Sequence, residues 1–271
     1  MTPIWQQSNS LAARFWENGI VEDCPVYDMH AHMGYHDSIY FKRCSPEAMV
    51  AHLRRIGVRR LVFSHDMALA GIMRNAEIVE ICKQFPDILR MYVSINPHFQ
   101  ENIKEDLAMF DKWQPYAIGL KFLADYHKVP VTDKAYEYAW KFADERGIPV
   151  LNHTWGTSPF NGGKVMYEAT RKYPNAKTFL GHCIFGEWDY AARCVNESSN
   201  VYLELTAVPG ERNRIEQLVS AVGSKKILFG TDLPWFDEYQ AVGGVLAAKI
   251  SDEEKRDILY RNAQEIFGND R

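Results

Sequence analysis

Eight short runs of β-branched and aliphatic residues recur along the chain, and segments with helical spacing of apolar residues lie between them. The predicted strands cover residues 26–32, 58–65, 88–95, 117–123, 148–154, 176–183, 200–206 and 225–232. Strands that alternate with helices pair in parallel through right-handed crossovers. Eight such units in 271 residues, near the usual barrel length of about 250 residues, predict an α/β protein folded as a (β/α)8 TIM barrel.

The helix signals agree with this alternation. Before the second strand, Ser45 is a candidate N-cap, Pro46 takes the first helical position and Gly57 ends the segment. Before the fifth strand, either Thr132 or Asp133 caps a helix that we expect Gly147 to end. A doubly wound open sheet also alternates strands and helices, but it normally carries a glycine-rich loop after its first strand. Here "MHAHMGYHD" has a single glycine, which favours the barrel.

The two ends of the chain lie outside the eight units. Residues 1–20 predict an N-terminal arm or extra helix, and residues 251–268 predict a final helix with Ser251 as its cap. No internal repeat, low-complexity tract or linker interrupts the sequence. We therefore expect residues 1–271 to form a single domain.

Composition excludes several classes of function. The net charge is −4, and no basic patch suggests nucleic acid. No apolar run approaches the roughly 20 residues of a membrane span, and the first 20 residues do not resemble a signal peptide. Five scattered cysteines without CxxC spacing argue for reduced thiols. We expect a cytoplasmic protein that acts on a small molecule, and a homo-oligomer is compatible with this composition.

The stretch "YDMHAHMG", residues 27–34, places two histidines one residue apart. On a strand, side chains two residues apart share a face, so Asp28, His30 and His32 are expected on one side. Two imidazoles directed at one point suit a divalent metal. Two ordinary strand histidines with satisfied hydrogen bonds are the simpler alternative, and the pair alone does not decide.

Polar residues recur at the ends of the other predicted strands. The set comprises His30, His32, His65, Lys121, His153, His182, Glu204 and Asp232. In a (β/α)8 barrel the carboxyl ends of all strands meet at one mouth, where catalytic residues gather. The sequence therefore predicts one polar site built from distant segments.

Four of these strand-end segments, "DMHAH", "VLNHTW", "FLGHC" and "ILFGTDLPW", together resemble the metal-dependent amidohydrolase superfamily. The "FGTDLPW" ending and the C-terminal "ILYRNAQEIFG" are similar to its amidohydrolase-2 branch, which includes hydrolases, lactonases and aminocarboxymuconate-semialdehyde-type decarboxylases. The resemblance extends from about Val26 to Gly268. It covers nearly the whole chain.

The resemblance implies a ligand set and a catalytic residue. His30, His32, His153 and Asp232 are expected to bind a divalent metal, usually zinc, although iron or manganese also suits such a set. His182 is expected to act directly on the substrate; its alternative is to hold a ligand in place. One ion is expected, and two remain open.

Lys121 and Glu204 carry open alternatives. Related binuclear enzymes have a carboxylated lysine at the end of strand four, so Lys121 can be a bridge to a second metal. It can equally contact substrate or pair with a carboxylate such as Glu204. Glu204 in turn is expected either to contact substrate or to support a ligand.

Hydrolysis of an ester, lactone or amide is the preferred hypothesis for the reaction. Zinc lowers the pKa of bound water from about 15.7 to about 7. Asp232 would take the water proton, and protonated His182 would stabilise the developing oxyanion. The alternative is non-oxidative decarboxylation of an aromatic or muconate-like acid. A metal-stabilised binding protein without catalysis is a third hypothesis, which the lack of recruited cysteine ligands disfavours.

Overall fold

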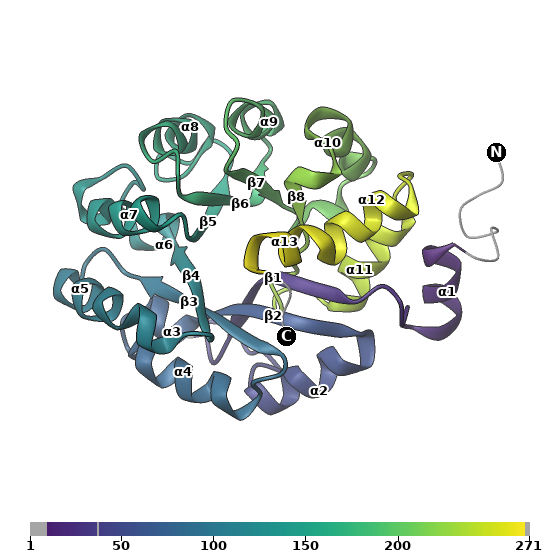
Figure 1. Ribbon diagram of the computed structural model, residues 1–271, viewed down its shortest axis with the longest axis horizontal. Coiled ribbons are helices and arrows are strands. Elements are labelled where there is room, and N and C mark those ends of the chain that lie inside the picture. Colours follow the sequence, from purple (N-terminus) through teal and green to yellow (C-terminus); the bar gives the residue numbers. More distant parts are fainter. Residues whose placement is uncertain (1–9, 37, 269–271) are drawn as a thin grey trace.

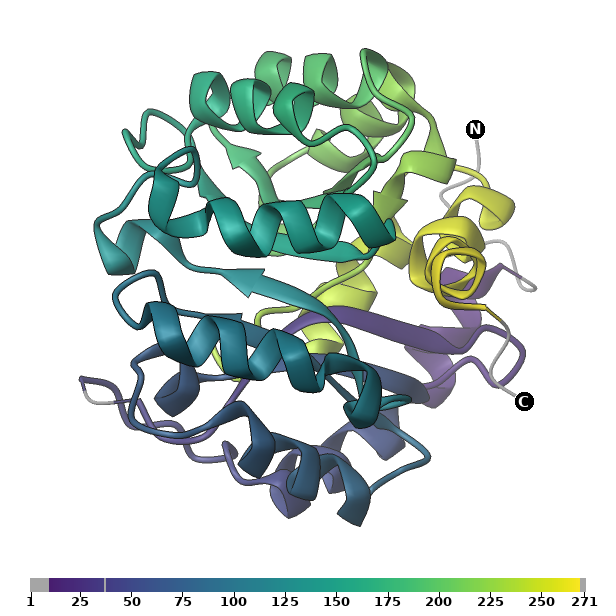
Figure 2. The same ribbon diagram turned by 60° about the vertical axis from the view of Figure 1, so that its left-hand side comes forward.

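The computed structural model describes residues 10–36 and 38–268. Its strands are β1 (Val26–Met33), β2 (Val58–His65), β3 (Leu89–Ile95), β4 (Ala117–Phe122), β5 (Pro149–Trp155), β6 (Lys177–Phe185), β7 (Val201–Glu204) and β8 (Ile227–Leu228). All neighbouring strands pair in parallel, in the order β1 to β8. This confirms the predicted (β/α)8 barrel, whose ring of outer helices is visible in Figure 1 and Figure 2.

Helices follow most strands and cover the outside of the sheet. They are α1 (Leu11–Asn18), α2 (Pro46–Ile56), α3 (Asp66–Leu69), α4 (Asn75–Gln84), α5 (Gln100–Met109), α6 (Ala124–His127), α7 (Lys134–Arg146), α8 (Gly163–Lys172), α9 (Trp188–Asn196), α10 (Arg214–Val222), α11 (Glu238–Ala247), α12 (Asp252–Arg256) and α13 (Asn262–Phe267). Short 3-10 turns lie at Phe110–Trp113, Val208–Gly210 and Ser224–Lys226, and a π-helical segment at Asp257–Arg261. Among these helices, none is both long and apolar enough to cross a membrane.

The predicted caps form local hydrogen bonds that fix the helix starts. The Ser45 hydroxyl accepts from the Ala48 N–H at the start of α2. Of the two candidates before α7, Asp133 is the cap: its carboxylate accepts from the Ala135 N–H at 2.8 Å. Gly57 ends α2 in the left-handed region at φ +86°, where glycine lacks the steric cost of a side chain.

Both predicted end segments contain helix, although neither is one uninterrupted α-helix over the predicted range. In the N-terminal arm, α1 begins at Leu11 with Ser10 as its cap, while residues 1–9 lie outside the described part. At the other end, helical segments α12, Asp257–Arg261 and α13 follow one another directly. Ser251 and Glu254 cap α12 reciprocally, as the sequence predicted for residues 251–268.

The last strand is much shorter than predicted. Only Ile227 and Leu228 pair with β7, and the chain then turns to β1. The N–H of Met29 donates to the Phe229 carbonyl at 2.9 Å, and the His32 N–H donates to the Leu233 carbonyl at 2.7 Å. These bonds close the barrel through an irregular segment, so residues 229–233 are held beside the two histidines of β1.

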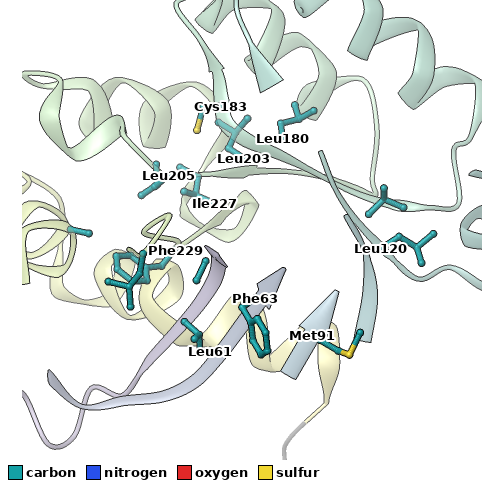
Figure 3. Packing of buried hydrophobic residues seen from close by; sticks show 14 of the residues in the cluster. Leu61, Phe63, Met91, Leu120, Leu180, Cys183, Leu203, Leu205, Ile227 and Phe229 are labelled. Atoms are coloured by element: carbon teal, nitrogen blue, oxygen red, sulfur yellow. The ribbon is translucent and has the colours of Figure 1, made fainter. Parts of the chain in front are cut away.

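Two apolar layers support this frame. The large outer cluster lies between strands and helices; Figure 3 shows some of its side chains, among them Leu61, Phe63 and Leu203. A smaller cluster combines residues from six strands with Ala263 of α13: Met29, Val62, Tyr92, Leu151, Phe179 and Leu228. The strands are therefore packed rigidly below the polar mouth, which holds strand-end side chains in fixed positions.

Candidate active site

The predicted strand-end residues gather in one buried group. His30 and His32 lie on β1, Lys121 on β4, His153 on β5, His182 on β6, Glu204 at the end of β7, and Asp232 four residues beyond β8. All except His153 are buried, and His153 is half-buried. His65 is not part of the group: its ring packs over Gly34, and its Nδ1 accepts from the Met67 N–H.

A bulge in β1 separates Asp28 from the two histidines that follow it. Asp28 pairs with Leu61 and His32 with Ser64, so three residues of β1 oppose two of β2 between Asp28 and His32. A bulge of this kind shifts the alternation of side chains. The expectation that Asp28 shares a face with His30 and His32 is therefore wrong: Asp28 lies on the face of Leu61, a residue of the outer cluster.

His30 is at the centre of the group. Its Nδ1 lies 2.7 Å from Glu204 Oε2, and its Nε2 lies 2.6 Å from Lys121 Nζ and 3.2 Å from Asp232 Oδ1. Glu204 Oε1 also accepts from the N–H and hydroxyl of Thr206. Glu204 therefore orients His30, while Lys121 and Asp232 both face its other nitrogen.

His32 is oriented in the same way by a residue that the sequence analysis missed. Asp66, directly after β2, places its Oδ1 2.6 Å from His32 Nδ1, and His32 Nε2 lies 3.3 Å from Asp232 Oδ1. Burial alone would lower the pKa of His32, but the Asp66 and Asp232 carboxylates raise it to about 9. Carboxylates commonly orient metal-binding imidazoles in this way, and no local pattern in "SHDM" indicates it.

His182 and His153 form the opposite side of the group. His182 Nε2 lies 3.0 Å from His153 Nδ1. The donor atoms of His30, His182 and Asp232 lie within 4.8 Å of one another. His182, expected to be catalytic, therefore lies in the same group of donor atoms as the expected ligands His30 and Asp232. The ring of His153 faces His182. Burial lowers the pKa of both imidazoles, that of His182 to about 3.

These electrostatics change one part of the sequence-based mechanism. The hydrolase hypothesis used a protonated His182, but an imidazole with a pKa of about 3 is neutral at pH 7. Burial would raise the pKa of Asp232, yet His30, His32 and His182 hold it well below the ordinary value, so Asp232 is a carboxylate. Burial also lowers the pKa of Lys121 to about 8 and raises that of Glu204 to about 8.

A buried carboxyl pair, Asp28 and Glu238, lies beside the segment that carries Asp232. Asp28 accepts from the Thr231 hydroxyl at 2.6 Å and from the His30 N–H at 3.0 Å. The buried Glu238, at the start of α11, lies beside Asp28, and burial followed by the Asp28 charge raises the pKa of Glu238 well above its ordinary value. Asp28 thereby ties β1 to the residues after β8.

A cavity of about 720 Å³ opens above the group, and His32, His153, His182 and Asp232 line it. Its walls carry five large aromatic side chains, Tyr35, Tyr126, Trp155, Trp235 and Phe236. Its remaining apolar walls come from loops and short helices after the strands, including Met67, Leu69, Ile72 and Leu123. Arg212, in the loop after β7, is exposed and lies outside this lining. The arrangement can hold a flat organic molecule against a cluster of imidazoles and a carboxylate.

Fold and site together define a barrel with ligand-type side chains converging at the carboxyl ends of its strands. The family model described as Amidohydrolase matches residues 27–268. The chain therefore belongs to the amidohydrolase family, as the four strand-end motifs indicated. A comparison with curated protein sequences found no match.

Solved structures similar to this chain include three decarboxylases. A 5-carboxyvanillate decarboxylase from Novosphingobium aromaticivorans, complexed with manganese and 4-hydroxy-3-methoxy-5-nitrobenzoic acid, has a TM-score of 0.70 at 13% identity, covering 91% of this chain and 96% of that one. A dihydroxybenzoic acid decarboxylase from Polaromonas with bound manganese scores 0.68 at 16% identity, covering 89% and 97%. A 2,6-dihydroxybenzoate decarboxylase from Rhizobium scores 0.65 at 14% identity, covering 89% and 98%. At these identities the likeness establishes the fold.

Proposed function

We propose that this protein is a metal-dependent decarboxylase that removes CO₂ from an aromatic carboxylic acid without an oxidant. The observation that carries the proposal is a buried cluster of imidazoles and a carboxylate beneath a cavity with aromatic walls. The three solved relatives support it, since each is named as a decarboxylase of a substituted benzoate. Hydrolysis was the preferred hypothesis from the sequence, and these findings support the decarboxylase alternative better.

The residues of the cluster fit a divalent ion. Carboxylates occupy Nδ1 of His30 and of His32, which leaves their Nε2 atoms for an ion. Asp232 Oδ1 is buried and faces the Nε2 atoms of His30 and His32, at 3.2 Å and 3.3 Å. Such an oxygen beside imidazole nitrogens suits manganese, iron or zinc. We infer that His30, His32, His153 and Asp232 would hold one ion, and manganese is the first to test because two relatives contain it.

A bound ion would anchor the carboxylate of the substrate and draw negative charge from it. The same ion would compete with the Lys121 ammonium for His30 Nε2, since Lys121 Nζ lies 2.6 Å from that atom. Trp155 and Tyr126 flank His153, with ring centroids 6.3 Å and 5.8 Å from its ring. These two aromatic side chains would pack on the ring of the substrate and exclude water from it.

Decarboxylation breaks the bond between ring carbon and carboxylate, and the electron pair left on the carbon must take a proton. Asp232 lines the cavity and is the residue best placed to deliver it. Because its pKa is held well below the ordinary value, Asp232 starts as a carboxylate and must first accept a proton. The hydroxyl of a hydroxybenzoate can supply that proton, and the phenolate left behind takes a proton from water to give the phenol, which favours hydroxylated aromatic acids as substrates.

The direct test is CO₂ release from a panel of hydroxybenzoates by the manganese-loaded protein. We expect CO₂ and the corresponding phenol in equal amounts, and a loss of at least about 100-fold in turnover for Asp232→Asn. Asp87→Asn is the matched control, since Asp87 is exposed and pairs with Arg54. Hydrolysis of esters, lactones or amides without CO₂ release from any acid would reject the proposal.

Hydrolysis remains the second candidate because one observation favours it. A carboxylate with a strongly lowered pKa, as at Asp232, is ionised at neutral pH and can accept a proton from water. The same protein preparation should therefore be assayed on both panels. Turnover on one panel alone distinguishes the two functions.

A further inference from the structure

We propose that the substrate carries a single carboxylate and that the rest of the molecule is uncharged. This inference rests on the proposed decarboxylase function and narrows its substrate class. It follows from the charges that line the 720 Å³ cavity above the cluster. The solved relatives make the choice concrete: 2,6-dihydroxybenzoate has one carboxylate, whereas 5-carboxyvanillate has two, one of vanillate and one of the added carboxy group.

The lining of the cavity supplies no guanidinium or ammonium group for a second carboxylate, and its His32 imidazole is already held between Asp66 and Asp232. Of the described residues that form it, none is lysine or arginine, and two, Asp66 and Asp232, are acidic. Most of the others are apolar or aromatic. A second carboxylate would therefore lose water without gaining a counter-charge, and it would enter a cavity that already carries two carboxylates.

Two of the lining histidines, His127 and His98, form hydrogen bonds with main-chain carbonyls. His127 Nε2 lies 2.9 Å from the Leu69 carbonyl, and its Nδ1 lies 3.1 Å from the Tyr136 hydroxyl. Burial lowers the pKa of His127, so this imidazole is neutral. His98 Nε2 lies 2.8 Å from the His127 carbonyl. These groups can order a neutral polar substituent, but they do not form a fixed positive site.

Three basic side chains outside the lining, Lys128, Arg43 and Lys121, serve other contacts. Lys128 lines a separate hollow beyond Tyr126 and Trp155, with its Nζ 5.6 Å from the centre of the Phe160 ring. Arg43 faces Asp237, with 3.6 Å between Nη2 and Oδ2. Lys121 lies beneath the cavity at His30 Nε2 and is outside the lining. The one carboxylate that this cavity can accommodate is therefore the one bound at the cluster.

The test compares two acids that differ by one carboxylate: 2,6-dihydroxybenzoate and its analogue with a second carboxylate on carbon 3. The manganese-loaded protein is assayed for CO₂ release, and binding is followed by quenching of tryptophan fluorescence, since Trp155 and Trp235 line the cavity. We expect kcat/KM and affinity to favour the monoacid by about 100-fold. A kcat/KM and an affinity for the diacid that equal or exceed those for the monoacid overturn the inference.

A charge added at the rim should reverse part of this preference. Ile72 is 73% exposed and lines the cavity. Ile72→Arg should raise kcat/KM for the diacid relative to the monoacid by about tenfold, whereas the polar but uncharged Ile72→Gln should leave that ratio unchanged. An equal effect of both variants counts against the inference, because the change would then reflect size.

The outcomes separate this inference from the function on which it rests. If neither acid releases CO₂ but the monoacid alone binds, the decarboxylase proposal fails and the charge inference stands. If both acids release CO₂ at similar rates, the function stands and the inference fails. If neither acid binds the manganese-loaded protein, both are overturned.

Discussion

At the scale of single residues, His182 begins a run of three residues with an uncommon backbone conformation. His182, Cys183 and Ile184 all adopt positive φ, at +61°, +53° and +51°. This region is sparsely populated by residues other than glycine and costs roughly 1–2 kcal/mol each. Such conformations persist where the surrounding structure holds them, often at functional sites. Here they direct the imidazole of His182 toward His30 and His153, with ring centroids 5.2 Å and 4.6 Å away.

The variant His182→Asn tests whether this imidazole acts on the substrate or on the ion. We expect turnover to fall about 100- to 1,000-fold, the usual effect of removing a polar group that contacts the reacting atoms. Metal content, measured by elemental analysis, should stay unchanged. Loss of the ion together with activity would instead make His182 a ligand, which its position near His30 and Asp232 also allows.

Asp66 offers a second test at this scale, because it holds His32 without being an expected ligand. Asp66→Asn replaces a carboxylate by a weaker acceptor at His32 Nδ1, 2.6 Å away. Loss of such orienting partners commonly weakens metal binding about 10- to 100-fold. Titration with manganese should show this, while Asp87→Asn retains the affinity of the unmodified protein. An unchanged dissociation constant for Asp66→Asn would remove Asp66 from the site.

The sequence predicted the strand-end histidines, with Glu204 as a possible supporting residue, but not Asp66, which orients His32. His30, His32, His153 and His182 stand at strand ends, and the barrel itself brings strand ends together. Asp66 pairs with His32 across two strands, and nothing in its neighbourhood distinguishes it from an ordinary helix-start aspartate. The bulge in β1 was likewise unpredictable from alternation, because it depends on which residues of β2 oppose Asp28 and Ala31.

At the scale of elements, the segment after β8 decides how the site closes. Prediction placed strand residues through position 232, but pairing with β7 ends at Leu228. Beyond it the chain approaches β1 closely, and Gly230 permits this approach. A Cβ at Gly230 would lie 2.1 Å from Glu204 Oε1 and 2.8 Å from His30 Cβ. Short apolar runs therefore predicted where strands occur, whereas this close contact between distant segments emerges only in the folded chain.

Gly230→Ala should consequently damage both stability and the site. We expect a loss of about 1–3 kcal/mol in the free energy of unfolding, typical of overpacking, together with weaker metal binding as Glu204 and His30 shift. Gly210→Ala is the matched control, because a Cβ there meets nothing within 4 Å. Thermal melting and metal titration of both variants provide the check. Similar behaviour of the two alanine variants would contradict the close-approach account.

The contact of α11 with β1 predicts a pH dependence of stability. The pKa of Asp28 is raised to about 7, chiefly by burial, and that of the neighbouring Glu238 is raised further. As the pH rises above about 4, the unfolded carboxyls ionise first. The folded state then binds more protons than the unfolded state, and its stability falls with rising pH until the folded carboxyls ionise.

Glu238→Gln removes one of these protons and should flatten that dependence. Relative to the unmodified protein, the variant should gain up to about 1.4 kcal/mol per pH unit between pH 5 and pH 7. Urea unfolding with a chelator present, at pH 5, 6 and 7, measures the difference. A stability difference that is the same at all three pH values would mean that Glu238 is ionised in the folded protein.

At the scale of the whole molecule, the barrel separates stability from chemistry. The outer and inner apolar clusters hold the strands, while the cavity and its aromatic walls are built from strand ends and the loops beyond them. The alternation of strands and helices predicted the barrel. Loop walls follow no periodic pattern, so the shape of the cavity was beyond sequence-based prediction, and with it the choice between decarboxylation and hydrolysis.

The most direct test of the whole account is anomalous diffraction at the manganese edge from crystals grown with manganese. We predict one strong peak within bonding distance of His30, His32, His153 and Asp232, beneath the aromatic cavity. The absence of a peak there, or a peak elsewhere on the barrel, would contradict the account, because both the proposed reaction and the substrate class depend on an ion at that point.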